Sequence, residues 1–399
     1  MKEIVQKIQS LLEKQDSTTY KEIYNFNYEI EVIPEYMNVP IPPALVADET
    51  ERKELIEGMV NLCVQKGIES RQCVLHKKYQ NDDTLAACLS TIQAISRNGK
   101  IDLQDSISDI PIYKDINSFL HSSLKVDYCI IGVASAGGLL PNEMRQDVIL
   151  SLKSGISIIN GLHSILNDDD ELRKISKQSN AKIYDIRESM PRNELTFWSG
   201  KIYDVKVPKI VVLGTDCGLG KRTTAKLIVG NLKKNNIKSD MVYTGQTGWM
   251  QGWDHGFIFD STLNDFVSGE LEKAIYDCYI SKKPKYILIE GQAALRNPSG
   301  PCGSEFLISA NVDGVILQHS PKRKYFDGWE HVNAVMPSLD SEIELINSYG
   351  KHVIAVTLNT QGMTDQEKIF HKQLISKDLD IPVFLPIDEG LDGILEILE

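Results

Sequence analysis

Short apolar runs alternate with longer amphipathic segments along most of the chain. In the first half, "DYCIIGVA" (127–134) and "ISIING" (156–161) are apolar runs of strand length, and "PNEMRQDVILSLKSG" (141–155) between them has helical spacing. In the second half the same alternation runs from "KIVVLG" (209–214) to "IPVFLPI" (381–387). Strands that alternate with crossover helices form parallel sheets, so the pattern predicts an α/β protein.

The length of the chain predicts two domains. One hydrophobic core rarely grows beyond about 250–300 residues, and this chain has 399. We predict two three-layer domains, each with a mostly parallel sheet, at residues 42–200 and 201–399, joined near residues 190–207. Residues 1–41 precede them as an amphipathic helix and an arm in which prolines interrupt both helix and strand.

Composition and charge exclude several classes of protein. The chain is 42% hydrophobic and 25% charged, as in soluble globular proteins, and no apolar run approaches the roughly 20 residues that cross a membrane. Its 43 basic and 55 acidic residues give a formal charge of −12, which disfavours nucleic acids and anionic membranes. The N-terminus lacks the apolar core of a secretory signal. We therefore expect a cytoplasmic homo-oligomer that acts on a small molecule, without a nucleic-acid or membrane partner.

The cysteines predict neither a disulfide framework nor a zinc site. They are odd in number and scattered, without a CxxC pair, at positions 63, 73, 88, 129, 217, 278 and 302. Most are expected to be small buried hydrophobes. Cys217 lies in a glycine-rich loop before a predicted helix, where the pKa of a thiol can fall. A packing role is favoured there over a catalytic one.

The predicted first domain has two candidate ligand loops. Gly132, Gly137 and Gly138 in "IIGVASAGGLLP" follow a strand, but the segment is not GxGxxG, so a dinucleotide fingerprint is poorly supported. A tight turn and a ligand-facing loop both remain open. His163 follows a later strand and is expected to be structural.

The strongest motif is "GTDCGLGKRTT", between a buried strand and a helix. In such a loop successive backbone N–H groups and the helix N-terminus bind an anion, and a lysine reaches the phosphate oxygens. Five residues separate Gly214 from Gly220, one more than in the commonest GxxxxGK[ST] pattern. We predict that this P-loop binds a phosphorylated cofactor through Gly214, Thr215, Asp216, Cys217, Gly218, Gly220, Lys221, Arg222, Thr223 and Thr224.

The residue after Lys221 bears on the kind of cofactor. Magnesium–ATP sites use a hydroxyl at that position to hold the metal, and Arg222 has none. Thr223 is one residue late, about 100° further around the helix. The phosphates of coenzyme A require no metal ligand, so we interpret the loop as holding a phosphorylated carrier, with coenzyme A and ATP both open.

Three further loops follow strands of the second domain. "YILIEG" (286–291) ends in Glu290, where related folds place a carboxylate near a magnesium-bound phosphate. "TGQTGWMQGWDHG" (244–256) contains two tryptophans and Gln246, which indicate a substrate wall. "LQHSPKRKYFDG" (317–328) contains His319 and three consecutive basic residues, for which solvated charge is the default and anion contact the alternative.

These motifs resemble known families. "GTDCGLGK" with "TT", and "ILIEGQAALRNP", are similar to dethiobiotin synthetase. "GVASAGGLLPNEMR", "GLHSILNDDDEL", "TGQTGWM" and "IEGQAALRNPSG" resemble, in order and spacing over roughly residues 42–395, the bacterial and archaeal domain of unknown function family number sixteen-eleven. This resemblance implies a Rossmann-like N-terminal domain and a P-loop NTPase-like C-terminal domain. Some members are D-glutamate N-acetyltransferases that use acetyl-CoA, which implies N-acyl transfer to an amino acid.

Three functions are consistent with the sequence. In the first, acetyl-CoA or another acyl-CoA donates to an amino acid; the substrate-binding residues are Gln246, Thr247, Gln292, Arg296 and Arg323, and the catalytic residues are Glu290, Gln246, His319 and Lys221. Glu290 or His319 would deprotonate the amine. The second is an ATP- and magnesium-dependent ligase or carboxylase of the dethiobiotin synthetase type, with Glu290 and either Asp260 or Asp265 on the metal. The third is a nucleotide-binding regulator without turnover.

Overall fold

The computed structural model describes residues 75–76, 112–113, 116–121, 126–131 and 138–398. These residues form two compact units, one up to Glu188 with Trp249–Gly252, and one of Ser189–Gly248 with Trp253–Glu399. The predicted arm at residues 1–41, Gly132 and Gly137 lie outside the described residues. None of the described helices combines the length and apolar character needed to cross a membrane.

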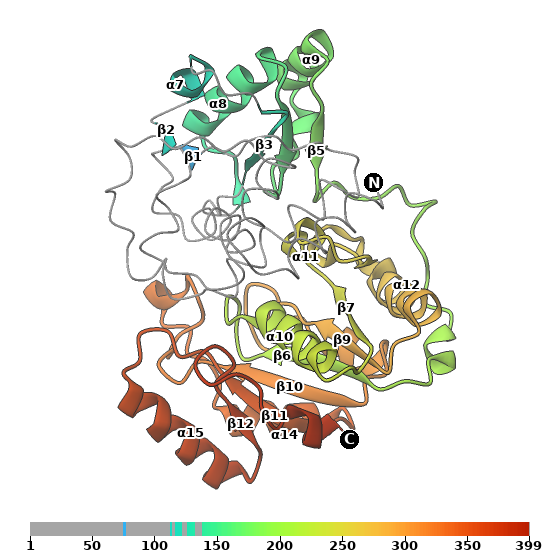
Figure 1. Cartoon of the computed structure of the whole chain (residues 1–399), viewed down its shortest axis with the longest axis vertical. Coiled ribbons are helices and arrows are strands. Elements are labelled where there is room, and N and C mark those ends of the chain that lie inside the picture. The colour runs from blue at the N-terminus through green and yellow to red at the C-terminus, as the bar shows by residue number, and fades with distance from the viewer. Residues whose placement is uncertain (1–74, 77–111, 114–115, 122–125, 132–137, 399) are drawn as a thin grey trace, which may run out of the picture. The chain divides into compact units, whose positions relative to one another are not determined.

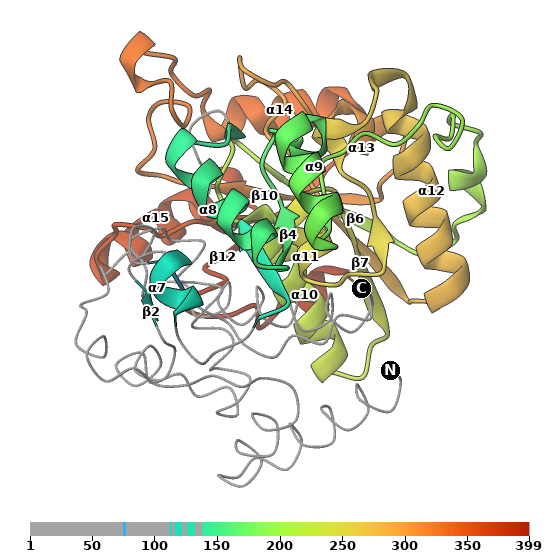
Figure 2. The ribbon, with the colours of Figure 1, turned by 90° about the horizontal axis from the view of Figure 1, so that it is seen from above.

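The first unit contains a parallel sheet in the order β3-β4-β5. Its crossover helices α8 and α9 lie side by side (Figure 2). Leu152, Ile158 and Leu172 are fully buried in its core. The elements are β3 (Tyr128–Ile131), α8 (Asn142–Lys153), β4 (Ser157–Asn160), the short helix η4 (Leu166–Asp168), α9 (Asp170–Ser179) and β5 (Ile183–Asp185), preceded by the parallel pair β1 (Leu75–His76) and β2 (Ile112–Tyr113) and by α7 (Ile116–Leu120).

The second unit is built on a seven-stranded parallel sheet in the order β12-β11-β10-β6-β9-β7-β8 (Figure 1). Every residue of β6 is buried, as expected for the central strand of a sheet covered on both faces. The strands are β6 (Lys209–Gly214), β7 (Ser239–Tyr243), β8 (His255–Gly256), β9 (Tyr286–Glu290), β10 (Gly314–His319), β11 (Val353–Leu358) and β12 (Val383–Phe384). The predicted α/β architecture with parallel sheets is confirmed.

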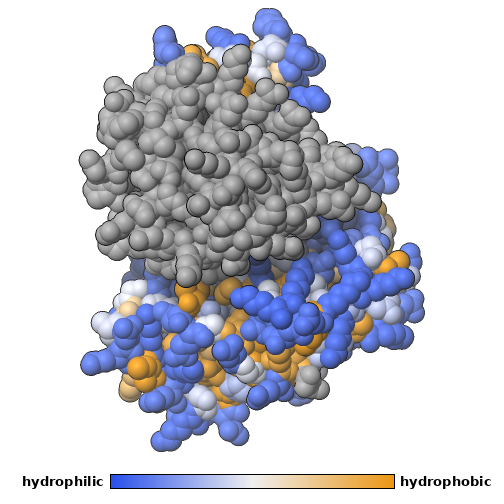
Figure 3. All heavy atoms as spheres, viewed as in Figure 1, coloured by the Kyte–Doolittle hydropathy of each residue, from blue (hydrophilic) through white to orange (hydrophobic). Residues whose placement is uncertain are grey.

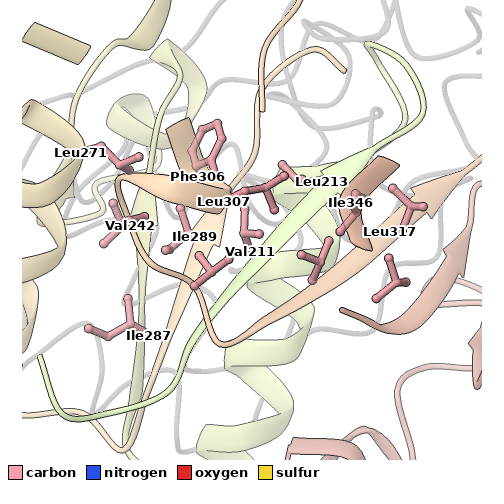
Figure 4. Packing of buried hydrophobic residues seen from close by; sticks show 14 of the residues in the cluster. Val211, Leu213, Val242, Leu271, Ile287, Ile289, Phe306, Leu307, Leu317 and Ile346 are labelled. Carbon is pink, nitrogen blue, oxygen red and sulfur yellow. The ribbon is translucent and has the colours of Figure 1, made fainter. Parts of the chain in front are cut away.

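Helices enclose the second sheet. α10 packs against β6, β7 and β9, while Leu271 of α12 and Phe306 of α13 join Val211, Leu213 and Ile289 in the main core (Figure 4). Hydrophilic side chains interspersed with apolar ones cover the visible face of this unit (Figure 3). The helices after residue 200 are α10 (Lys221–Lys234), α11 (Gln246–Met250), α12 (Asn264–Lys282), α13 (Ser304–Ile308), α14 (Leu339–Ser348), α15 (Asp365–Leu379) and α16 (Ile394–Leu398).

Residues 189–200 group with the second unit, although we placed the boundary after residue 200. Two buried carboxylates of α12 explain this grouping. Glu270 Oε1 accepts a hydrogen bond from the Thr196 N–H at 2.7 Å, and Glu272 Oε2 accepts one from the Ser199 N–H at 2.7 Å. The segment thus supplies hydrogen-bond donors to both buried carboxylates.

Candidate functional site

The predicted strand, glycine loop and helix are present from β6 to α10. Gly218 and Gly220 have φ angles of +62° and +93°, in the left-handed region that residues with a Cβ avoid. Gly220 forms the N-cap of α10, and a Cβ on it would meet no heavy atom within 4 Å, so the loop is open at this point. The loop therefore has the backbone path that a phosphate cradle requires.

The side chain of Lys221 folds back into this loop. The residue is 8% exposed, and its Nζ donates hydrogen bonds to the carbonyl oxygens of Asp216 at 2.7 Å and Ala293 at 2.8 Å. Burial lowers the pKa of this ammonium. A cation held by two carbonyl oxygens can exchange one of them for a phosphate oxygen, which pairs with it more strongly.

Asp216 in the loop has no exposed surface, and both of its carboxylate oxygens accept hydrogen bonds. Its Oδ1 accepts a hydrogen bond from Asn297 Nδ2 at 2.9 Å. Its Oδ2 accepts from Arg323 Nη1 at 2.9 Å and from the Asp327 N–H at 2.8 Å. The carboxylate therefore ties the loop to the segments that follow β9 and β10. These hydrogen bonds give Asp216 a positioning role, and its predicted cofactor contact stays a prediction. Asn297 and Asp327 were not predicted, because no local motif marks them.

Of the three consecutive basic residues, the structure directs only Arg323 to the loop. Its Nη1 also donates to the Cys217 carbonyl at 2.6 Å. Lys322 Nζ instead donates to Glu367 at 2.8 Å, and Lys324 Nζ lies 5.1 Å from the ring centroid of Tyr325. Arg323 thus supports the loop, while its predicted contact with substrate stays a prediction.

Glu290 lies at the end of β9, next to the strand that leads into the loop. β6 and β9 pair with Val212 opposite Glu290. The Glu290 side chain is buried, and its Oε2 accepts from the Thr244 N–H at 3.0 Å. Gln292 Nε2 donates to Thr244 Oγ1 at 2.9 Å, which brings a second predicted site residue to the same place. Burial raises the pKa of Glu290, and the charge of Arg222 opposes that rise.

Two glycines let the backbone around α11 approach this carboxylate. A Cβ on Gly248 would lie 3.2 Å from Glu290 Oε2, and one on Gly245 would lie 3.1 Å from Gln292 Nε2. Gln246 and Thr247, predicted to bind substrate, stand between these glycines and are partly exposed. The glycines of "TGQTG" were the sequence signal for this close approach. The predicted loop contains a short helix.

His319 contacts the first residue of the loop. Thr215 Oγ1 and His319 Nδ1 are 3.0 Å apart, and the Thr215 N–H donates to the Gln318 carbonyl at 3.0 Å. Burial lowers the pKa of His319 to about 4, with a smaller contribution from His371. The imidazole is therefore neutral near pH 7 and a weak base.

Gln318 is a site residue that the sequence did not reveal. Its buried Oε1 accepts hydrogen bonds from Thr224 Oγ1 and Thr357 Oγ1, both at 2.6 Å. The hydroxyl of Thr224, predicted to contact the cofactor, thus joins α10 to β10 and β11. Thr223 is also buried, at 3% exposure.

Comparison with known families identifies both halves of the chain. Residues 98–189 match the family model described as "Domain of unknown function (DUF1611_N) Rossmann-like domain", and residues 196–395 match "Domain of unknown function (DUF1611_C) P-loop domain". The chain belongs to the DUF1611 family. The resemblance noted in the sequence is confirmed, with matched residues that begin at 98.

Relatives of this DUF1611 protein include two curated proteins named D-glutamate N-acetyltransferase. The one from a Pseudoalteromonas species is 28% identical over 273 residues, covering 67% of this chain and 79% of the relative. The one from Tritonibacter scottomollicae is 26% identical over 276 residues, covering 67% and 80%. The crystal structure of a DUF1611 family protein from Anabaena variabilis has a TM-score of 0.66 at 24% identity, covering 74% of this chain and 86% of the other, and shows the same fold.

The remaining predicted site residues of this DUF1611 protein are Arg296, Asp260 and Asp265. Arg296 Nε donates to Glu342 Oε2 at 2.7 Å, and its Nη1 donates to Ser341 Oγ at 2.6 Å, so its guanidinium binds α14. Asp260 and Asp265 are exposed. Within the part of the chain that the structure describes, no cluster of three or more His, Cys, Asp or Glu side chains is arranged for a metal ion.

Cys217 has the surroundings of a packing residue. Burial raises the pKa of its thiol, and Asn297 Nδ2 lies 3.6 Å from its sulfur. A thiol that stays protonated is a poor nucleophile. Burial also raises the pKa of Cys129 to about 11 and that of Cys278 to about 12.

The candidate loops of the first unit have local structural roles. The His163 N–H donates to the Gly138 carbonyl at 2.8 Å, and a Cβ on Gly138 would lie 2.1 Å from the imidazole Cδ2. Gly138 therefore permits a close contact, as a tight turn would require. Asp185 organises the neighbouring loop by accepting from Asn160 Nδ2 at 2.7 Å and from the Leu166 N–H at 3.0 Å.

The lowered pKa of His319 predicts a loss of stability in acid. Because the folded value is about 4 and the ordinary value is 6.5, protons bind the unfolded state more readily as the pH falls below about 6.5. Between pH 7.5 and 5 this group should remove about 2 kcal/mol from the free energy of unfolding. In urea unfolding, the free energy of unfolding of His319→Gln should fall between these pH values by about 2 kcal/mol less than that of the wild type. His331→Gln, at an exposed position, is the control; equal falls in both variants would contradict the prediction.

Proposed function

We propose that this protein is an N-acyltransferase that transfers an acetyl group from acetyl-CoA to the amine of an amino acid such as D-glutamate. The observation that carries the proposal is the P-loop, in which the Lys221 ammonium reaches inward and arginine replaces the metal-binding hydroxyl. The names of the curated relatives support the choice of acyl transfer. The choice of acceptor follows from those names alone.

The loop would bind the phosphates of coenzyme A. Its backbone N–H groups, the N-terminus of α10 and Lys221 Nζ are the donors. Acetyl-CoA supplies the thioester carbonyl carbon, which forms a bond to the amine nitrogen as the bond to sulfur breaks. Gln246, Thr247 and Gln292, at the Glu290 end of the sheet, would bind the acceptor. The acceptor ammonium must lose a proton before the amine can attack.

Glu290 is the better candidate for the base that takes this proton. Burial raises the pKa of Glu290 above its ordinary value and so makes the carboxylate a stronger base, while the charge of Arg222 favours the ionised form that accepts a proton. His319, with a pKa of about 4, binds protons too weakly. The structure therefore favours Glu290 over His319 between the two bases considered.

Transferase activity is tested with purified protein, acetyl-CoA and a panel of D- and L-amino acids. We expect release of free CoA, followed with a thiol reagent, together with an N-acetylated product identified by mass. Glu290→Gln should lower kcat by about 10²–10⁴-fold, the usual contribution of a general base. His319→Gln, the control, should lower it far less. No CoA release with any acceptor would refute the transferase.

A magnesium–ATP-dependent ligase or carboxylase of the dethiobiotin synthetase type is the second candidate. It is favoured by the buried Glu290 at the end of the strand beside the loop. This reaction would release ADP in the presence of substrate and stop when the metal is chelated. Nucleotide binding that alters assembly without turnover would instead indicate a regulator.

A further inference from the structure

We infer that the P-loop binds its phosphate ligand without a divalent metal ion, because Arg222 occupies the position of the metal-binding hydroxyl and the carboxylate of Glu290 is held by a backbone N–H. The inference rests on the proposed role of the loop as a phosphate site. It concerns the metal requirement, which the family model and the relatives' names leave open.

The hydroxyl that a magnesium site needs is missing from the first turn of α10. P-loop enzymes hold the metal with Ser or Thr directly after the lysine and with an acid on a neighbouring strand. Here Arg222 occupies the first position. Thr224 is two residues late, and its Oγ1 donates to Gln318 Oε1 at 2.6 Å. The first turn therefore offers arginine where the metal would be bound.

The acid on the neighbouring strand is already engaged. Glu290 Oε2 accepts from the Thr244 N–H at 3.0 Å, and Gly248 packs so closely that a Cβ would lie 3.2 Å from the same oxygen. A metal at this oxygen would have to compete with the Thr244 N–H, and the backbone of α11 limits the room beside it.

Arg222 adds a second cation directly after Lys221 in the first turn of α10. Its Nε is fully buried, and its charge opposes the rise that burial causes in the pKa of Glu290. Glu290 is itself buried, so this charge acts with little screening by water. Arginine also binds phosphate oxygens in pairs, which gives Arg222 a second use when the ligand is present.

The ligand class that follows is a phosphate ester bound by protein donors alone, such as the adenosine 3′-phosphate 5′-diphosphate part of coenzyme A. Calorimetric titration of the full chain with CoA, and separately with ATP, tests this in EDTA and in magnesium. We expect the Kd of the preferred ligand to agree within about twofold between the two buffers, and a tenfold tighter Kd in magnesium would overturn the inference.

Failure of the transferase proposal can be told apart from failure of this inference. If CoA does not bind but ATP does, acetyl transfer from CoA is refuted, and the comparison of EDTA with magnesium for ATP decides the metal requirement. If neither ligand binds in EDTA but one binds in magnesium, the inference is overturned; if neither binds in either buffer, the proposed phosphate site is refuted. Each titration measures ligand affinity and does not depend on transferase activity.

Substitution of Arg222 provides a second test. Arg222→Thr restores the hydroxyl and removes the guanidinium, so we expect its ligand affinity in EDTA to fall about tenfold and to recover with magnesium. Arg222→Lys keeps the charge and should remain independent of magnesium. Lys234→Thr, at an exposed position in the last turn of α10, is the matched control. An Arg222→Thr protein that binds in EDTA as tightly as the wild type would contradict the inference, and the wild-type titrations decide it if that variant does not fold.

Discussion

Replacing Lys221 with methionine is expected to weaken the proposed binding of CoA by about 100-fold while it changes the free energy of unfolding by less than about 1 kcal/mol. The loss of affinity follows from the charge-assisted hydrogen bonds that Nζ would make to phosphate, which are stronger than neutral ones. Methionine has nearly the same length, so the backbone of the loop should keep its path.

The small change in stability results from two opposing effects. Burial penalises the ammonium, as its lowered pKa shows, and methionine removes this penalty. The same substitution leaves the carbonyl oxygens of Asp216 and Ala293 without the hydrogen bonds they now accept at 2.7 and 2.8 Å. Titration with CoA measures the first effect, and urea unfolding without ligand measures the second.

The control for Lys221 is Lys234→Met, since Lys234 is exposed at the other end of α10. It should leave both affinity and stability close to those of the wild type. Unchanged CoA affinity in Lys221→Met would show that the lysine does not face the phosphate. A large loss of stability would show that its hydrogen bonds within the loop outweigh the burial of its charge.

The sheets could be predicted because their signal is local. "KIVVLG" and "KYILIE" are short apolar runs rich in β-branched residues, and such runs form buried parallel strands. The loop between β6 and α10 was also predictable, because its glycines adopt the left-handed angles that the turn requires. Short elements were missed: α11 and α13 have five residues each, too few to show a helical period.

The supports of the site could not be predicted because they join distant parts of the chain. Asp216 lies 81 residues from Asn297, 107 from Arg323 and 111 from Asp327, so no local spacing connects them. The side chain of an arginine such as Arg296 can equally meet a ligand or a carboxylate on another helix. Only the fold shows that Glu342 is its partner.

Asp216→Asn is expected to lower the free energy of unfolding by about 3 kcal/mol, because it leaves the buried side of the Arg323 guanidinium without its carboxylate. Asparagine has the same shape but one of its two oxygens becomes an NH₂ group. Both oxygens of Asp216 accept hydrogen bonds, so whichever way the amide turns, a donor would face a donor from Asn297, Arg323 or the Asp327 backbone. Urea unfolding measures the loss.

The matched control is Asp327→Asn, the same substitution in the same cluster. The Asp327 side chain is 57% exposed, and its Oδ1 lies 4.0 Å from Arg323 Nη2, so the change should cost no more than about 0.5 kcal/mol. Asp327 would still donate its backbone N–H to residue 216. Similar losses in the two variants would show that net charge, and not the buried hydrogen bonds, determines the effect.

A double-mutant cycle with Arg323→Met then measures the interaction between Asp216 and Arg323 separately from the other effects of each substitution on stability. If Asp216 and Arg323 stabilise the loop as a pair, the double variant should lose about 1–3 kcal/mol less than the sum of the two single losses. The same pair should matter for ligand binding, because Arg323 also donates to the Cys217 carbonyl and so holds two consecutive residues of the cradle, one by its side chain and one by its backbone. CoA affinity should therefore fall in Asp216→Asn even where the protein remains folded. Additive losses with unchanged affinity would mean that the loop keeps its shape without this pair.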